Sequence, residues 1–324
     1  MVWERARAAK EKFEAVILRK PHVVGVGVAK KKIGGKETDE PCVVVFVEKK
    51  VPNSQLRKKD RVPETVGGVK TDVIETGEIR ALGLSTPEAI SRTARIRPAL
   101  GGVSIGHVRT TAGTLGATVH CGGQRLILSN NHVLANSNDA SRGDSILQPG
   151  PADGGTANDE IAVLETFVPI AFEDPRASST SAWTRFLQRL GVRRRSISEG
   201  NRVDAALARP LRDADLSEKI LDIGRVAGVT EVHVGAMVRK SGRTTGLTEG
   251  RIIATDSTVR VRYGPHVATF RHQLVAGPMS GPGDSGSLAV DTENRAVGLL
   301  FAGSDLTTVF NPISSVREAL GIEL

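Results

Sequence analysis

A serine loop near the C-terminus constrains this 324-residue chain more than any other stretch. In residues 281–290, Ser285 stands between Asp284 and Gly286, just ahead of an apolar run that is typical of a buried strand. Glycines in the loop let the backbone turn tightly, so that successive N–H groups can converge beside the serine hydroxyl. Acyl transfer requires a hydroxyl next to such fixed donors. An ordinary Gly/Ser turn has the same pattern, so this loop alone does not decide the chemistry.

A serine nucleophile needs a base, and His132 stands apart among the seven histidines. It follows an apolar strand that ends in small polar residues, in the sequence LILSNNHVL. A buried carboxylate would hold the imidazole in one tautomer, and Asp204 lies in an Ala/Val/Leu run where burial is costly without a partner. The alternative for His132 is a capping or surface histidine, and the alternative for Asp204 is a surface-facing aspartate on an alternating strand. Asp153 and Asp159, both in polar loop sequence, are the rival carboxylates.

The order of His132, Asp204 and Ser285 resembles the trypsin/chymotrypsin superfamily of serine proteases, whose triad runs His, Asp, Ser along the chain. The segment KSGRTTGLTEG at 240–250 is similar to the SGRTTG segment of bacterial streptogrisins and α-lytic-type proteases. The LSNNHV form of the histidine motif resembles bacterial trypsin-like proteins and the plant narrow-leaf serine proteases. Residues 96–324 carry the resemblance, which implies a mainly β fold with a chymotrypsin-like double Greek-key β-barrel.

The resemblance also implies an activity, a serine endopeptidase that works through an acyl-enzyme. It implies that the N–H groups of Gly283 and Ser285 receive the oxyanion. It further implies that Arg243 pairs with Asp284 and supports the loop without a newly cut N-terminus. The residues that it assigns to the substrate pocket are Met279, Leu300, Phe301 and Ala302. Because Met279 is not acidic, we expect a small or apolar residue before the scissile bond rather than Lys or Arg.

Two other function classes stay open. A chymotrypsin-fold binding or scaffold protein could keep the triad residues without turnover. A nucleic-acid-associated protein could use the net charge of +8 and the arginines at 193–195, but the basic residues are scattered along the chain. Neither class accounts for the coincidence of three triad motifs. We therefore expect a protein or peptide substrate rather than nucleic acid, and the oligomeric state, a homo-oligomer included, is left open.

Composition sets the remaining expectations. The sequence shows no Cys/His cluster, so we expect neither a metal nor a cofactor. The two cysteines, Cys42 and Cys121, lie in separate segments, and Glu249 stands where the streptogrisin pattern has a cysteine. No apolar run has the length of a signal peptide or a membrane span. These features predict a cytoplasmic protein.

The chain divides into three parts by pattern. Residues 1–80 predict a small α+β accessory domain, with a helix before Pro21 and strands at 23–29, 42–48 and 69–75. Residues 81–95 predict a linker, and 96–324 the protease domain. A hairpin at 114–128 delivers His132. Residues near 173–200 read as an insertion, with Trp183, Phe186, Leu187 and Leu190 at helical spacing.

Overall fold

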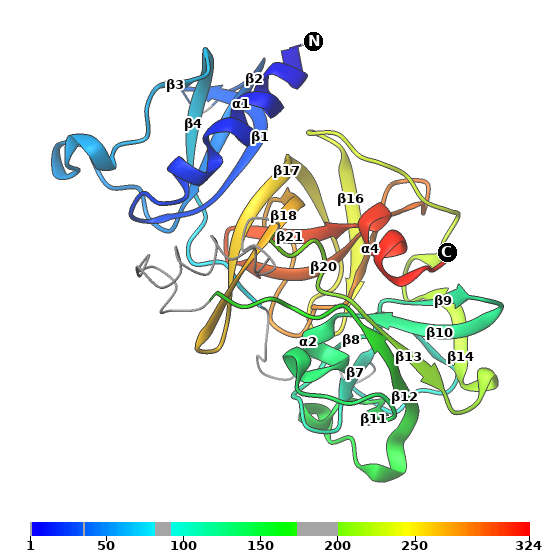
Figure 1. The fold of residues 1–324 in the computed structure, drawn as a ribbon. Coiled ribbons are helices and arrows are strands. Elements are labelled where there is room, and N and C mark those ends of the chain that lie inside the picture. Colours follow the sequence, from blue (N-terminus) through cyan, green and yellow to red (C-terminus); the bar gives the residue numbers. More distant parts are fainter. Residues whose placement is uncertain (1, 35, 82–91, 174–199) are drawn as a thin grey trace, which may run out of the picture.

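The computed structural model describes residues 2–34, 36–81, 92–173 and 200–324. The part that it describes is mainly β and holds two barrels, which lie side by side in Figure 1. The predicted helix of the insertion and most of the predicted linker fall outside the described residues. No helix in the described ranges is long and apolar enough to cross a membrane.

The first barrel carries the histidine and aspartate motifs. Its strands run in the order β8-β7-β11-β12-β13-β10-β9. Their bounds are β7 Ser104–His107, β8 Gly113–Thr114, β9 Ala117–Cys121, β10 Gln124–Ser129, β11 Ser145–Leu147, β12 Glu160–Phe167 and β13 Ala206–Pro210. The β9–β10 hairpin turns at Gly122 and Gly123, which both have positive φ, as the sequence pattern predicts. Beside the barrel, a smaller sheet contains β6 Ala99–Gly101, β14 Leu216–Ile220 and β15 Gly224–Arg225.

The second barrel carries the serine loop. Its strands form the ring β16-β17-β18-β21-β20-β19, which the β19–β16 pairing closes. The bounds are β16 Met237–Gly242, β17 Gly246–Tyr263, β18 His266–Ala276, β19 Leu288–Val290, β20 Ala296–Ser304 and β21 Thr307–Pro312. The helix α4, Ile313–Leu320, follows β21 and packs against β20. These two barrels give the chain a chymotrypsin-like fold.

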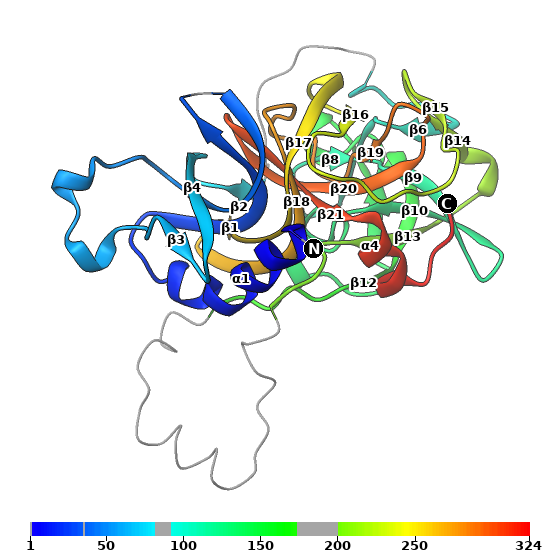
Figure 2. The same cartoon turned by 90° about the horizontal axis from the view of Figure 1, so that it is seen from above.

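The N-terminal segment extends the sheet of the second barrel. Its elements are α1 Val2–Ile17, β1 Val23–Ile33, β2 Lys36–Val47, β3 Thr65–Val66, β4 Val69–Glu75 and β5 Arg80–Ala81. Because β1 pairs antiparallel with β17, the barrel sheet continues through β1, β2 and β4 to β3. The extension lies to one side of the barrel and is coloured blue in Figures 1 and 2. The predicted helix and strands form, but within one continuous sheet.

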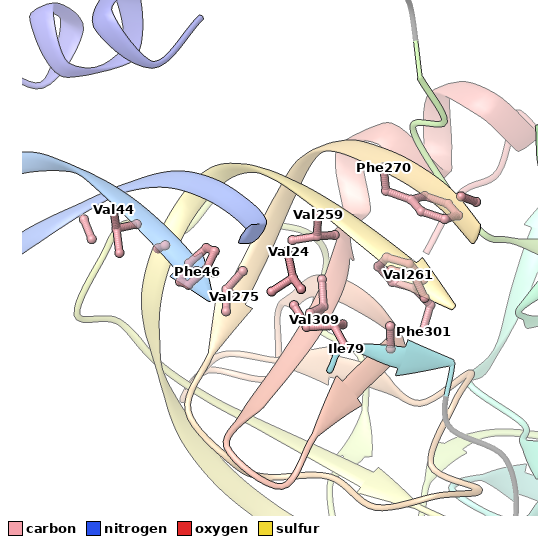
Figure 3. Close-up of a cluster of buried hydrophobic side chains, with 14 of the residues drawn as sticks. Val24, Val44, Phe46, Ile79, Val259, Val261, Phe270, Val275, Phe301 and Val309 are labelled. Atoms are coloured by element: carbon pink, nitrogen blue, oxygen red, sulfur yellow. The ribbon is translucent and has the colours of Figure 1, made fainter. Parts of the chain in front are cut away.

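From Pro41 onward, strand β2 is buried on both faces, which explains the unbroken apolar run that ends it. Val43, Val45 and Val47 pack in one cluster with Ala9 and Ile17 of α1. The alternate residues Cys42, Val44 and Phe46 pack in another cluster together with barrel residues such as Val259, Phe301 and Val309, and Figure 3 shows part of this cluster. The N-terminal segment and the second barrel therefore share a hydrophobic core.

The shared core predicts that the two parts unfold together. Phe46→Ala removes a fully buried ring and should cost about 3–5 kcal/mol of unfolding free energy. Calorimetry should show a single transition that moves to lower temperature as a whole. Val16→Ala is the control, because Val16 is 60% exposed on α1. Two separate transitions, of which only the smaller one shifts, would contradict the shared core.

Candidate active site

His132 is positioned by the small polar residues that precede it. It belongs to α2, Asn131–Leu134, which begins directly after β10. Ser129, Asn130 and Asn131 are all fully buried, and each donates a hydrogen bond to a backbone carbonyl: Ser129 Oγ to Thr114 (2.8 Å), Asn130 Nδ2 to Asp204 (2.7 Å) and Asn131 Nδ2 to Val168 (2.8 Å). The SNN sequence thus anchors the end of the strand and restricts where the imidazole can lie.

Asp204 lies just ahead of β13, and its side chain is fully buried. Its Oδ2 accepts a hydrogen bond from His132 Nδ1 at 2.6 Å, and its Oδ1 is 3.3 Å from the His132 backbone N. An ionised carboxylate only accepts, so the proton of this bond lies on Nδ1, and the lone pair of the neutral imidazole lies on Nε2. Nε2 is buried and has no hydrogen-bond partner in the described part of the chain.

Tyr263, the only tyrosine in the sequence, also reaches this carboxylate. Its hydroxyl donates to Asp204 Oδ2 at 2.8 Å, and its ring meets that of His132 edge to face at 5.8 Å between centroids. Burial, the Asp204 charge and this hydrogen bond raise the pKa of the phenol well above its ordinary value. Tyr263 therefore remains a donor at all physiological pH values. No motif in the sequence indicated Tyr263, and its uniqueness in a chain with so few aromatic residues was the available signal.

The rival carboxylates have other partners. Asp159 accepts hydrogen bonds from the Thr156 backbone N and hydroxyl, both at 2.9 Å, and so caps a short 3-10 helix, Ala157–Asp159. Asp153 accepts from Ser104 Oγ at 2.5 Å and pairs with Arg243. Of the candidates considered, Asp204 is the one that the structure joins to His132.

Ser285 is fully buried in the turn before β19, where its Oγ donates to the Phe301 carbonyl at 3.4 Å. Its own carbonyl accepts from Thr114 N at 2.8 Å. The serine loop packs closely on the segment that holds the histidine, since a Cβ on Gly286 would collide with Ser129 Oγ. The structure therefore brings the loop that carries the serine against the strand that carries the imidazole.

The peptide units of the predicted oxyanion hole are held in fixed orientations. The Pro282 carbonyl accepts from Thr244 Oγ1 at 2.6 Å, and the Asp284 carbonyl accepts from Ser287 Oγ at 2.6 Å. In a trans peptide the N–H points opposite to the C=O, so the N–H groups of Gly283 and Ser285 point away from these partners. That both converge on one oxyanion stays a prediction. Ser287 Oγ holds the Asp284 carbonyl and thereby orients the peptide unit that contains the Ser285 N–H.

The predicted pair between Arg243 and Asp284 is wrong. Arg243 instead makes a two-pronged contact with Asp153, with Nε to Oδ2 at 2.8 Å and Nη2 on Oδ1. Both side chains are only 4% exposed. Asp153 lies on a short 3-10 helix of the first barrel, Pro151–Asp153, so Arg243 bridges the two barrels. It also packs on Gly283, where a Cβ would lie 2.9 Å from Nη1.

Lys240 is the cation that pairs with Asp284. Its Nζ lies 3.1 Å from Asp284 Oδ2, and both side chains are fully buried. The carboxylate also accepts from the backbone N of Thr244 (2.9 Å), Thr245 (3.1 Å) and Gly281 (3.0 Å), and from Thr245 Oγ1 (2.5 Å). Burial lowers the pKa of Lys240, and the neighbouring Asp284 partly offsets that effect. The KSGRTTG segment thus folds around the carboxylate, and its lysine makes the ion pair.

The residues assigned to the substrate pocket all lie in the core. Met279 and Leu300 belong to one apolar cluster, and Phe301 and Ala302 to another. The last three are fully buried, and Met279 is 5% exposed. Their assignment to the substrate pocket stays a prediction. No group of three or more His, Cys, Asp or Glu within the described ranges is placed to hold a metal ion.

Solved structures of several bacterial proteases are similar to this chain. No family model and no curated protein matches the chain. Among solved structures, the chain is similar to Thermobifida fusca protease A (TM-score 0.47, 19% identity) and to Nocardiopsis protease (TM-score 0.47, 21% identity). It is also similar to Cellulomonas bogoriensis chymotrypsin (TM-score 0.45, 22% identity). Each match covers 69% of this chain and 97% of the other.

Removal of the Lys240 cation beside Asp284 should lower the free energy of unfolding, whereas the same substitution of an exposed lysine should not. Lys240→Met leaves a buried carboxylate without its cation, which should cost about 3–5 kcal/mol of unfolding free energy. Denaturant titration measures this cost. Lys219→Met makes the same chemical change at an exposed position of β14 and should change the free energy little. Equal unfolding midpoints for the two variants would contradict the assignment.

Proposed function

We propose that this protein is a serine endopeptidase with His132 as general base, Asp204 as its orienting carboxylate and Ser285 as nucleophile. The observation that carries the proposal is the buried bond of 2.6 Å between His132 Nδ1 and Asp204 Oδ2, which leaves Nε2 as the basic atom. A buried imidazole with an unpaired Nε2 is unfavourable unless a proton donor reaches it. The serine loop lies against this segment and carries the hydroxyl.

The chemistry follows from these positions. Rotation of the Ser285 side chain away from the Phe301 carbonyl directs Oγ to Nε2, which takes the proton as Oγ attacks the peptide carbonyl. Asp204 stabilises the imidazolium, and the N–H groups of Gly283 and Ser285 receive the oxyanion. His132 then protonates the leaving amine. Water attacks the acyl-enzyme in the same way and releases the second product.

One observation favours a second candidate, a binding protein of this fold without turnover. Ser285 Oγ points to a carbonyl rather than to the imidazole. A fluorophosphonate probe distinguishes the two candidates, because it reacts only with a serine that its base activates.

The endopeptidase proposal predicts labelling that depends on the triad. Fluorophosphonate should label the wild-type chain and should not label Ser285→Ala. Asp204→Asn should cleave unfolded casein roughly 10⁴-fold more slowly, since the imidazole loses its tautomer. Asp159→Asn is the matched control, because it makes the same change at a carboxylate away from His132. Wild-type protein that neither reacts with the probe nor cleaves casein would favour the binding protein.

We also propose that Tyr263 is a positioning residue for Asp204. Tyr263→Phe removes one of the donors that fix the position of the Asp204 carboxylate, so the imidazole is held less well and kcat should fall by roughly 10–100-fold. Without this donor the carboxylate holds more negative charge next to the imidazole and stabilises the imidazolium. The acidic limb of the kcat/KM profile should therefore move to higher pH.

Phe172→Leu is the control for Tyr263→Phe. Phe172 packs edge to face on the Tyr263 ring at 5.7 Å, so this variant disturbs the packing and keeps the hydroxyl. A pH profile that shifts equally in both variants would assign Tyr263 a packing role only.

A further inference from the structure

The second half of β20 carries a short partner strand on one edge. Residues Ala302 and Gly303 pair with β21 on one side. On the other side they pair antiparallel with β5, in the register Ala302 opposite Ala81 and Gly303 opposite Arg80. β5 also pairs in parallel with β17 at Arg262. A segment from the N-terminal extension thus lies against the second barrel between two of its strands.

This edge begins next to the candidate nucleophile. The carbonyl that accepts from Ser285 Oγ belongs to Phe301, the residue before Ala302. The serine loop is tied to the same strand, because Gly286 N donates to the Leu300 carbonyl at 2.8 Å and Leu300 N donates to the Ser287 carbonyl at 2.9 Å. A backbone that pairs with Ala302 and Gly303 therefore leads directly towards Ser285.

A polypeptide substrate needs an edge of this kind. To present one carbonyl to Ser285, its backbone must be extended and held at fixed depth, and pairing with the edge of a strand does both through main-chain hydrogen bonds. Such pairing is independent of sequence. The edge that β5 covers is the one that borders the serine loop.

We propose that β5, Arg80–Ala81 of the chain's own N-terminal extension, occupies the edge of β20 at Ala302 and Gly303 with which an extended polypeptide substrate would pair. A substrate polypeptide lies across Ser285 only after this segment has left the edge. The inference rests on the proposed endopeptidase function and adds an intramolecular competitor to it.

Segment 76–81 is anchored at its N-terminal end and lightly held at β5. Thr76 N donates to the Val47 carbonyl at 2.8 Å, and Ser304 Oγ donates to the Thr76 carbonyl. Ile79 is 1% exposed and packs in the cluster that contains Phe301, as Figure 3 shows. Beyond Ile79, the pairing of β5 involves two residues only. The nearby ion pair of Glu78 with Arg262 is partly exposed, and exposed pairs of this kind contribute little to stability. Release of β5 is therefore possible without loss of the anchor.

A reversible crosslink tests the proposal. Arg80 and Gly303 are directly opposite in an antiparallel pair, where Cα atoms lie about 4.5–5.5 Å apart, within disulfide range. The double variant Arg80→Cys/Gly303→Cys should lock β5 when oxidised and free it when reduced. Cleavage of unfolded casein should be at least about tenfold slower in the oxidised than in the reduced protein. The two single variants, carried through the same oxidation and reduction, are the controls.

A fluorophosphonate probe keeps this test separate from the proposed function, because the small probe does not need the docking edge. Labelling in both redox forms, with casein cleavage slow only in the oxidised form, supports the proposal. Equal cleavage in the two forms overturns it and leaves the endopeptidase assignment intact. If Gly303→Cys prevents folding, Ala81→Cys/Ala302→Cys places the crosslink one residue along the same pairing.

Absence of labelling in every form would reject the endopeptidase function, and the docking edge is then decided by binding alone. In a Ser285→Ala background, fluorescein-labelled unfolded casein should bind the reduced double variant at least about tenfold more tightly than the oxidised one. Equal affinity in the two redox forms overturns the docking edge.

Discussion

The burial of the Asp204 carboxylate is the constraint on which the candidate site depends. A buried charge is stable only with hydrogen bonds to its oxygens, and here the donors come from both barrels. His132 belongs to the first barrel, whereas Tyr263 ends β17 of the second. The backbone around Asp204 is held in the same way, by Asn130 from the first barrel and by Asn311 from β21 of the second. The aspartate therefore joins the two barrels and orients the imidazole at their junction, and neither barrel could do both alone.

A second buried carboxylate, Asp284, organises the serine loop by the same principle. Its donors are the lysine and the threonine groups of one hairpin, β16–β17, which carries the KSGRTTG segment. Gly242 is needed there, since a Cβ would collide with Asp284 Oδ1. The positive charge beside Asp284 is thus supplied by a lysine of the same hairpin. Arg243 does not pair with Asp284; it links the same hairpin to the first barrel through Asp153.

Local pattern predicted much of the fold, and non-local contacts account for what it missed. The hairpin before His132 and the strand 69–75 follow from alternation and turns, and the two-barrel architecture from the resemblance to the trypsin/chymotrypsin superfamily. Lys240 and Arg243 lie three residues apart at the start of one hairpin, and spacing cannot tell which cation reaches Asp284 and which reaches the other barrel. Tyr263 is 59 residues from Asp204 in the chain, so no local pattern links them. The pairing of β1 with β17, which merges the N-terminal segment into the barrel sheet, is equally non-local.

The long strand β17 connects the N-terminal extension to the candidate active site. It spans Gly246–Tyr263, pairs with β16 and β18 within the barrel, and pairs with β1 and β5 outside it. One end begins at the threonine segment that holds Asp284, and the other ends at the tyrosine that holds Asp204. A change in how the N-terminal extension pairs with β17 therefore acts on a strand that contacts Asp204 through Tyr263 and directly follows the threonines that hold Asp284. Because the extension also supplies β5, which pairs with β20, one continuous sheet links the N-terminal segment to Tyr263, which holds Asp204, and to the strand whose Phe301 carbonyl accepts from Ser285.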